Sequence, residues 1–353
     1  MFRGAYQGKQ YHESDLHRVL RRAKTTGVER IIATAGTLED SIEAIALVQK
    51  FDASGTSKSD AGDTRSETKK QSTSTPALFT TVGVHPTRCD VFENSGDAEA
   101  YFQKLLEHAA KHSGNNDDND DSSAVSDSPS SSKRVVAIGE CGLDYDRLQF
   151  CGKDTQVVWF ERQFELSRVT QLPMFLHSRA AHADFFQILK RMRSEHELPP
   201  CVVHSFDGSV DELNDLLTLP DVYIGINGCS LRTEESLEVV NMIPSDRMMA
   251  ETDAPWCAIR NTHPGMVNNF VTTKWQSKDK KKIYKELEGC TDVNAVQELE
   301  TSVQRVTVKD RCEPCHIVQV VEVLAAVRGE DPETLAEACR ANTMKVFFPN
   351  DGN

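Results

Sequence analysis

The alternation of strand-like and helical segments is the feature that most restricts how this chain can fold. Short apolar runs recur along the sequence, and between them apolar residues return at the spacing of an amphipathic helix. This order predicts an α/β protein whose parallel strands are joined by helices. The seven runs expected as strands are 30–34, 78–84, 135–139, 173–176, 201–203, 222–226 and 247–252.

A closed (β/α)₈ barrel needs eight strands, one more than these runs supply. The deficit lies at the N-terminus, because the chain opens on a loop and a helix. We therefore expect a TIM-type barrel whose first strand is absent. A single domain over 1–353 is predicted, with polar insertions at 52–76 and 111–134 and a long excursion at 261–310.

Four potential metal ligands follow these expected strands directly or closely. They are Glu140, His177, His204 and Asp253. The carboxyl ends of parallel strands meet at one mouth of a barrel, so these side chains are expected to converge there. Two carboxylates and two imidazoles together suit a divalent cation. Any one of them alone could equally be a capping carboxylate or a hydrogen-bonded core histidine.

Charge and hydropathy exclude several classes of protein. No apolar run approaches the roughly twenty residues of a membrane helix, and the N-terminus lacks the apolar core of a secretion signal. We expect an intracellular protein, cytoplasmic or nuclear, with no membrane partner; no stable protein partner can be inferred. The net charge of −14 argues against broad electrostatic adhesion to nucleic acid. It does not exclude a phosphodiester substrate, because a metal site can supply positive charge locally.

The ten cysteines do not indicate a disulfide framework. Cys201, Cys229 and Cys339 lie inside strand or helix patterns, so we expect them to be buried small hydrophobes or free thiols. Cys312 and Cys315 form a C-x-x-C next to His316. No second pair of matching spacing follows, which favours the start of a helix at this point over a structural zinc site.

Five short segments carry a family resemblance. They resemble, in order, the signature segments of the TatD family of metal-dependent deoxyribonucleases, which have an amidohydrolase-type barrel. The resemblance extends from about Met1 to Phe348, apart from the two polar insertions and much of the excursion. The segments are Gly83–Pro86, Gly139–Asp144, His177–Arg179, His204–Phe206 and Glu251–Pro255.

The resemblance implies roles for the four expected ligands. Glu140 would bridge two divalent cations, and His177 and His204 would bind one of them as neutral imidazoles. Asp253 would ligate the other and hold or deprotonate the attacking water. One or two cations are implied, and Mg, Mn and Zn all suit this mixed ligand set.

Three further residues are candidates for substrate contact. His85 would act as a phosphate contact or an acid, with a structural histidine as the alternative. Arg179 would clamp a phosphate, or alternatively form a salt bridge to Asp144. Asn227 would line or support the rim.

The sequence departs from the family at its start. TatD proteins carry a first strand with a D-x-H-x-H-type motif, and this sequence begins after the corresponding position. We therefore expect one well-occupied cation and one weak or substrate-assisted cation. The leading prediction is a deoxyribonuclease that trims DNA ends by a metal-activated water. The alternatives are another metal-dependent hydrolase on the same barrel and a catalytically impaired scaffold. No strand-borne lysine lies near Glu140, which favours the nuclease over an amide-cleaving enzyme.

Overall fold

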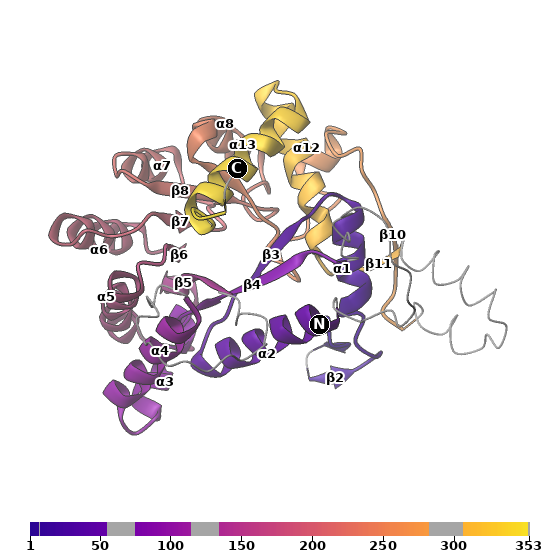
Figure 1. Ribbon diagram of the computed structural model, residues 1–353. Coiled ribbons are helices and arrows are strands. Elements are labelled where there is room, and N and C mark those ends of the chain that lie inside the picture. The colour runs from indigo at the N-terminus through magenta and orange to yellow at the C-terminus, as the bar shows by residue number, and fades with distance from the viewer. Residues whose placement is uncertain (7, 55–74, 114–133, 282–305, 352–353) are drawn as a thin grey trace, which may run out of the picture.

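A computed structural model describes residues 1–6, 8–54, 75–113, 134–281 and 306–351 (Figure 1). Most of the two polar insertions predicted at 52–76 and 111–134 lies outside the described residues, as does half of the excursion at 261–310. Among the described residues, no helix combines the length and the apolar composition of a membrane span.

A sheet of seven parallel strands forms the centre of the molecule. Each strand pairs with the next one along the chain, and the sheet curls while helices cover its outer side (Figure 1). The predicted curved α/β sheet with seven strands is confirmed. The strands are β3 (Arg30–Ala33), β4 (Ala77–Val82), β5 (Val135–Asp144), β6 (Met174–Arg179), β7 (Cys201–Val203), β8 (Val222–Ile226) and β9 (Met248–Ala250).

The connecting helices bury one apolar face against the sheet. Phe160, Phe164, Phe185 and Leu213 are almost completely buried in the main core, which lies between the sheet and this outer layer. Burial of aromatic and aliphatic side chains contributes most of the stability of such a layer. The helices are α1 (Leu16–Thr25), α2 (Leu38–Ser54), α3 (Asp90–Asn94), α4 (Ala98–Ser113), α5 (Lys153–Thr170), α6 (His182–Glu195), α7 (Val210–Leu217), α8 (Glu234–Asn241), α9 (Pro264–Val267), α12 (Ile317–Arg328) and α13 (Pro332–Phe347).

Carboxylates lie at the starts of two helices. Asp331 caps α13, because its side chain accepts a hydrogen bond from the Thr334 N–H at 2.9 Å. The N-cap of α5 is Gly152, and Asp154 lies inside the first turn of this helix. A carboxylate there still interacts favourably with the helix dipole.

The C-terminal helix α13 fills the interior of the sheet at the amino ends of its strands. Phe347 and Phe348 pack in one cluster with Val136, Val202 and Tyr223, which come from three different strands. The side chain of Asn342 donates to the carbonyl of Met248, the first residue of β9 (2.7 Å). One end of the sheet is therefore closed, and the carboxyl ends of the strands form the open end.

The sheet is not closed into a ring within the described residues, because β3 and β9 each pair on one side only. A cavity of about 2080 Å³ lies between these two strands. Ile32 and Met249 line it from the two sides, and it continues to Asp253 at the open end and to Met1 at the N-terminus. This cavity occupies the position where an eighth strand would complete a barrel.

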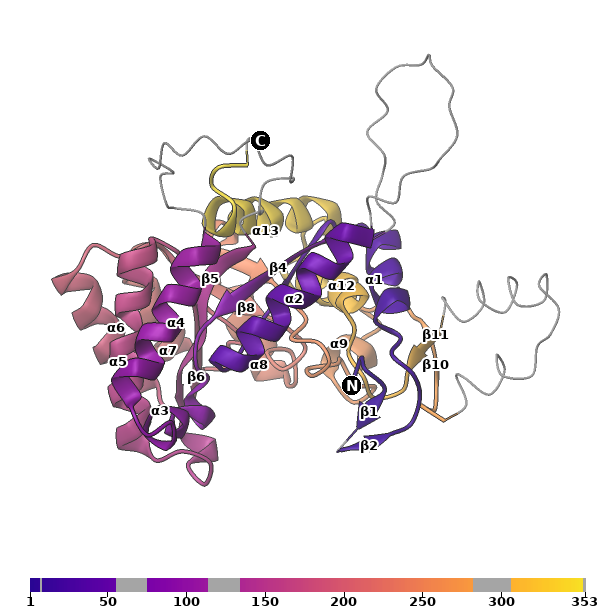
Figure 2. The same cartoon turned by 60° about the horizontal axis from the view of Figure 1, so that its bottom comes forward.

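Two small sheets lie outside the seven strands, and the sequence patterns did not predict them. β1 (Ala5–Tyr6) and β2 (Lys9–Gln10) form an antiparallel hairpin. β10 (Gln276–Lys278) and β11 (Val306–Val308) pair in parallel within the long excursion. Both lie toward the same end of the molecule as α9, away from α13 (Figure 2).

Candidate metal centre

Glu140 lies inside a strand, whereas the sequence analysis placed it at a strand end. β5 continues to Asp144, but the pairing with β6 shifts register between Gly139 and Cys141, so Glu140 has no partner on β6. Such a bulge re-aims a side chain. Gly139 has φ +140°, and a Cβ atom there would lie 2.2 Å from the Phe175 carbonyl oxygen. Only glycine fits this position.

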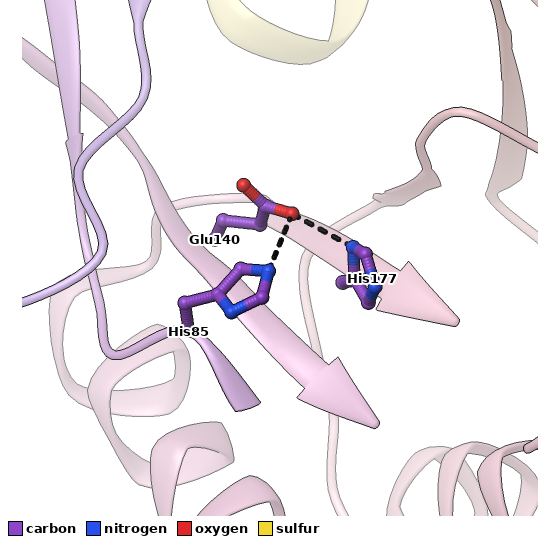
Figure 3. A group of neighbouring side chains, drawn as sticks. All are labelled: His85, Glu140 and His177. Atoms are coloured by element: carbon purple, nitrogen blue, oxygen red, sulfur yellow. Dashed lines mark hydrogen bonds and ion pairs between the residues drawn. The ribbon is translucent and has the colours of Figure 1, made fainter. Parts of the chain in front are cut away.

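Glu140, His177 and His204 meet at one carboxylate oxygen. Oε1 of Glu140 lies 2.8 Å from Nδ1 of His177 and 2.8 Å from Nε2 of His204. The two imidazole nitrogens are 3.2 Å apart. His85 approaches the same oxygen from another side, with its Nε2 at 3.3 Å (Figure 3). Three of the four ligands expected from the sequence therefore converge within hydrogen-bonding distance.

The charges in this cluster shift one another strongly. Burial opposes ionisation of Glu140, but His204, His177 and His85 outweigh it and hold the pKa of Glu140 well below its usual value. Burial also opposes protonation of His204, yet Glu140 and Glu251 raise its pKa well above the usual value. The pKa of His177 is raised against burial by Asp144 and Glu140. In the metal-free cluster the ionised carboxylate of Glu140 thus favours the protonated forms of His177 and His204.

The geometry of this cluster fits a divalent cation. Three donors bound at about 2.1 Å around one cation lie about 3.0 to 3.4 Å apart in octahedral or tetrahedral geometry. The edges observed between Glu140, His177 and His204 are 2.8, 2.8 and 3.2 Å. His85, Glu140 and His177 also offer donor atoms that lie within 4.8 Å of one another. Small outward movements of these side chains would admit the ion.

A second carboxylate stands behind each imidazole. Nε2 of His177 faces Oδ2 of the fully buried Asp144 at 3.3 Å, and Nδ1 of His204 faces Oε1 of Glu251 at 3.6 Å. Histidines that bind metals usually present their second ring nitrogen to a carboxylate or carbonyl, which fixes the ring and makes the ligand more basic. The orienting roles of Asp144 and Glu251 were not predicted from the sequence, although both residues lie inside the family segments.

Glu251 is itself held by the neighbouring strands. Its Oε1 accepts hydrogen bonds from the Ser205 N–H (2.5 Å) and from Nδ2 of Asn227 (3.1 Å). Asn227 is fully buried, and its Oδ1 accepts from the Cys229 N–H at 2.8 Å. The expected rim residue Asn227 is therefore placed behind Glu251, where it orients this carboxylate.

His85 differs from the other two histidines in its hydrogen bonding. Its Nδ1 accepts from the Thr87 N–H at 3.2 Å, and it lies 2.7 Å from the Thr87 hydroxyl. Burial lowers the pKa of His85 and keeps the ring neutral. A neutral imidazole whose Nδ1 accepts carries its proton on Nε2. His85 consequently presents an N–H donor to the centre of the site, which suits a phosphate oxygen better than a cation.

Asp253 lies at the edge of the same site. It has a positive φ of +48°, and it lines the large cavity together with His204 and Glu251. Burial raises the pKa of Asp253 to about 7, assisted by Glu251 and Glu140 and opposed by His204. A carboxyl group with a pKa near neutrality can accept a proton from water and release it again.

Arg179 forms a different ion pair from the expected one. Its Nη1 lies 3.3 Å from Oδ2 of Asp207, and the expected pair with Asp144 is not formed. Asp144 instead pairs with Arg147 and His177, both at 3.3 Å. The guanidinium of Arg179 is partly exposed, so its contact with a phosphate stays a prediction.

The cysteine prediction is wrong at one position. Cys229 forms a disulfide with Cys257, with a Cα–Cα distance of 5.0 Å. The bond joins the loop after β8 to the loop after β9, and Sγ of Cys257 lies 3.2 Å from Oδ2 of Asp253. Cys201 and Cys339 are buried free thiols, as predicted.

Comparisons with known proteins identify the family of this chain. The family model described as "TatD related DNase" matches residues 6–348. The chain is 36% identical over 350 residues to the deoxyribonuclease Tat-D of Schizosaccharomyces pombe, covering 98% of this chain and 92% of that protein. It is 31% identical to a protein of Erwinia billingiae named 3'-5' ssDNA/RNA exonuclease TatD, covering 76% of this chain and 77% of that protein.

A solved structure shows the same fold. The chain superimposes with a TM-score of 0.78 on an uncharacterized amidohydrolase from Saccharomyces cerevisiae, at 30% identity and with 98% of this chain and 96% of the other covered. The family match spans nearly the whole described chain, including every residue of the candidate metal centre. This chain therefore belongs to the TatD related DNase family.

Proposed function

We propose that this protein is a metal-dependent deoxyribonuclease that removes nucleotides from DNA ends. The observation that carries the proposal is the convergence of Glu140, His177 and His204 at one oxygen atom in a chain of this family. The name of the Erwinia relative supports an exonucleolytic mode. We propose an intracellular location, cytoplasmic or nuclear, where DNA, the proposed substrate, is found.

Glu140, His177 and His204 are proposed to hold a divalent cation, with Asp253 as a further ligand. A bound cation would supply positive charge that neutralises a phosphate and favours deprotonation of water. Glu140 would stay ionised across the physiological pH range, because its pKa is held low. Asp144 and Glu251 would keep the two imidazoles oriented toward Glu140.

The protein groups have separate roles in the proposed hydrolysis. Asp253, which lines the cavity beside His204 and Glu251, accepts the proton of the attacking water. The Nε2–H of His85 donates to a phosphate oxygen or to the leaving oxygen, while Thr87 holds the ring in this tautomer. Arg179 is proposed to contact a neighbouring phosphate, and Asn227 to orient Glu251.

The test uses purified protein and single-stranded DNA labelled at either end. Cleavage is measured with Mg²⁺, Mn²⁺ or Zn²⁺ added and with EDTA, and product ladders from the two labels give the direction of digestion. We expect metal-dependent release of nucleotides from one end and loss of at least two orders of magnitude in Glu140→Gln. Glu238→Gln, an exposed site on α8, is the matched control. Chelator-insensitive cleavage, or equal activity of both variants, would refute the proposal.

A further inference from the structure

A group of lysines surrounds one tyrosine away from the metal centre. Nζ of Lys280 lies 4.3 Å from the centre of the Tyr11 ring, and those of Lys9 and Lys281 lie 5.8 and 6.0 Å from it. Lys280 is also 4.8 Å from the ring of Tyr6. We call Lys9, Tyr11, Lys280 and Lys281 the Tyr11 cluster. Its members come from opposite ends of the sequence.

The positive charges of this cluster have no carboxylate partners among the described residues. No ion pair is formed by Lys9, Lys280 or Lys281 within that part of the chain, and Lys9 and Lys281 are exposed. The carboxylate of Asp279 accepts the backbone N–H of Lys281 at 2.9 Å. Cation–π contact compensates part of the repulsion between the ammonium groups. Three lysines are thus held together in a protein whose net charge is −14.

The cluster rests on a buried support. Arg311 is fully buried and pairs with Asp15 at 2.6 Å and Glu313 at 2.8 Å, which ties the N-terminal segment to the segment that follows β11. Tyr6 packs against Val306 and Val308, and Tyr11 is part of the same apolar contact. This support fixes the β1–β2 hairpin next to β10–β11, so the lysines are held together by the fold.

The cluster lies on the same side as the open end of the sheet. The β1–β2 hairpin and the β10–β11 pair lie toward the same end of the molecule as α9, which follows β9 and Asp253 in the chain (Figure 2). The large cavity lined by His204 and Asp253 continues to Arg3 and Ala5, where the hairpin begins. The segment that leads into the hairpin therefore borders the same cavity as Asp253.

We propose that the Tyr11 cluster binds the phosphate backbone of single-stranded DNA a few nucleotides away from the scissile bond, an inference that rests on the proposed nuclease function. Ammonium groups on flexible stems neutralise phosphates without reading sequence. Such a contact would allow an enzyme with a negative net charge to bind a long anionic polymer through one local group of lysines. The cluster should thus matter for long oligonucleotides and be unimportant for very short ones.

The test compares two triple variants of equal charge. The cluster variant carries Lys9→Gln, Lys280→Gln and Lys281→Gln, and the control carries Lys104→Gln, Lys111→Gln and Lys190→Gln on the outer helices α4 and α6. Binding of labelled thirty-nucleotide and four-nucleotide oligothymidylates is measured by anisotropy in EDTA at several salt concentrations. Cleavage of both lengths is measured with the activating metal.

We expect the cluster variant to bind the long strand about tenfold more weakly than the control variant. Its slope of log affinity against log salt should be smaller by about 2, at about 0.7 per lost phosphate contact on single strands. The ratio of kcat/KM on the long strand to that on the short one should fall about tenfold. Equal affinities and equal salt slopes in the two variants would overturn the assignment. It would also be overturned if polyglutamate displaced the DNA from the parent protein at a concentration of negative charge equal to that of the DNA.

The two proposals fail in different ways. Absence of metal-dependent cleavage together with a lysine-dependent affinity for the long strand would refute the nuclease and leave the Tyr11 cluster supported as a DNA contact. Normal cleavage with no difference between the two triple variants would refute the cluster alone.

Discussion

His177 and His204 point ring nitrogens at the same oxygen of Glu140, and these nitrogens are only 3.2 Å apart. In the metal-free chain the carboxylates raise the pKa of both histidines, which favours their protonated forms. A cation requires both rings to be neutral. Metal and protons therefore compete for one position.

Metal binding should release protons. We expect a net release of protons at neutral pH, because the pKa of each histidine is raised and both rings must be neutral to bind the cation. Affinity should rise with pH as the histidines lose their protons. Isothermal titration in buffers of different ionisation enthalpy counts the protons. Binding that is independent of both buffer and pH would contradict the protonated cluster.

Replacement of Asp253 by Asn should stabilise the metal-free protein at high pH. The folded-state pKa of Asp253 is raised to about 7, so ionisation in the folded chain lowers the free energy of unfolding as pH rises from about 4 to 7. The penalty is at most about 4 kcal/mol, at about 1.4 kcal/mol per pKa unit. Urea unfolding in EDTA should show a gain for Asp253→Asn at pH 8 that shrinks toward pH 4. A gain of the same size at both pH values would exclude this cause.

Glu251 should control metal affinity without contacting the cation. Glu251→Gln keeps an oxygen for the Ser205 N–H but removes the charge that faces Nδ1 of His204. We expect affinity to fall about 10- to 100-fold, as is usual when the partner of a ligating histidine is lost. Competition with a fluorescent chelator measures this change, and Glu238→Gln on the exposed face of α8 serves as its control. An unchanged affinity would show that Glu251 does not orient His204.

Arg311 should be among the residues most important for stability. It is fully buried between Asp15 and Glu313, so Arg311→Met leaves the buried Asp15 carboxylate without its ion-pair partner, while Glu313 keeps its pair with Arg22. Loss of one member of a buried ion pair costs about 3 to 5 kcal/mol. The exposed pair of Arg340 and Glu337 provides the comparison, and Arg340→Met should cost less than about 1 kcal/mol. Equal midpoints of urea unfolding for the two variants would contradict the role of this network.

Periodicity and family segments together predicted most of the sheet and the centre of the site. Each strand can be predicted from its own apolar run. Parallel strands then bring residues at their carboxyl ends, such as His177 and His204, close together regardless of the structure of the connecting loops. The bulge that directs the Glu140 side chain into the site cannot be predicted from the local sequence, because it depends on the pairing of β5 with β6. Without the bulge, β5 was expected to end at Gly139, and Glu140 was therefore predicted to follow the strand.

Contacts between segments that are far apart in the chain were not predicted from the sequence. Asp15 and Arg311 are separated by 296 positions, and nothing in either local pattern indicates that they pair. The disulfide between Cys229 and Cys257 could not be predicted either, because the spacing of cysteines in a sequence does not determine which of them pair. Strands of two or three residues, such as β1 and β10, are too short to produce a period.

The position of α13 has a consequence for synthesis of the protein. The inner face of the sheet, with Val136, Val202 and Tyr223, is covered by Phe347 and Phe348, which follow all seven strands in the sequence. While the ribosome is still adding the segments before α13, this apolar surface has no native cover. The strands therefore expose an aggregation-prone face during synthesis until α13 has been added.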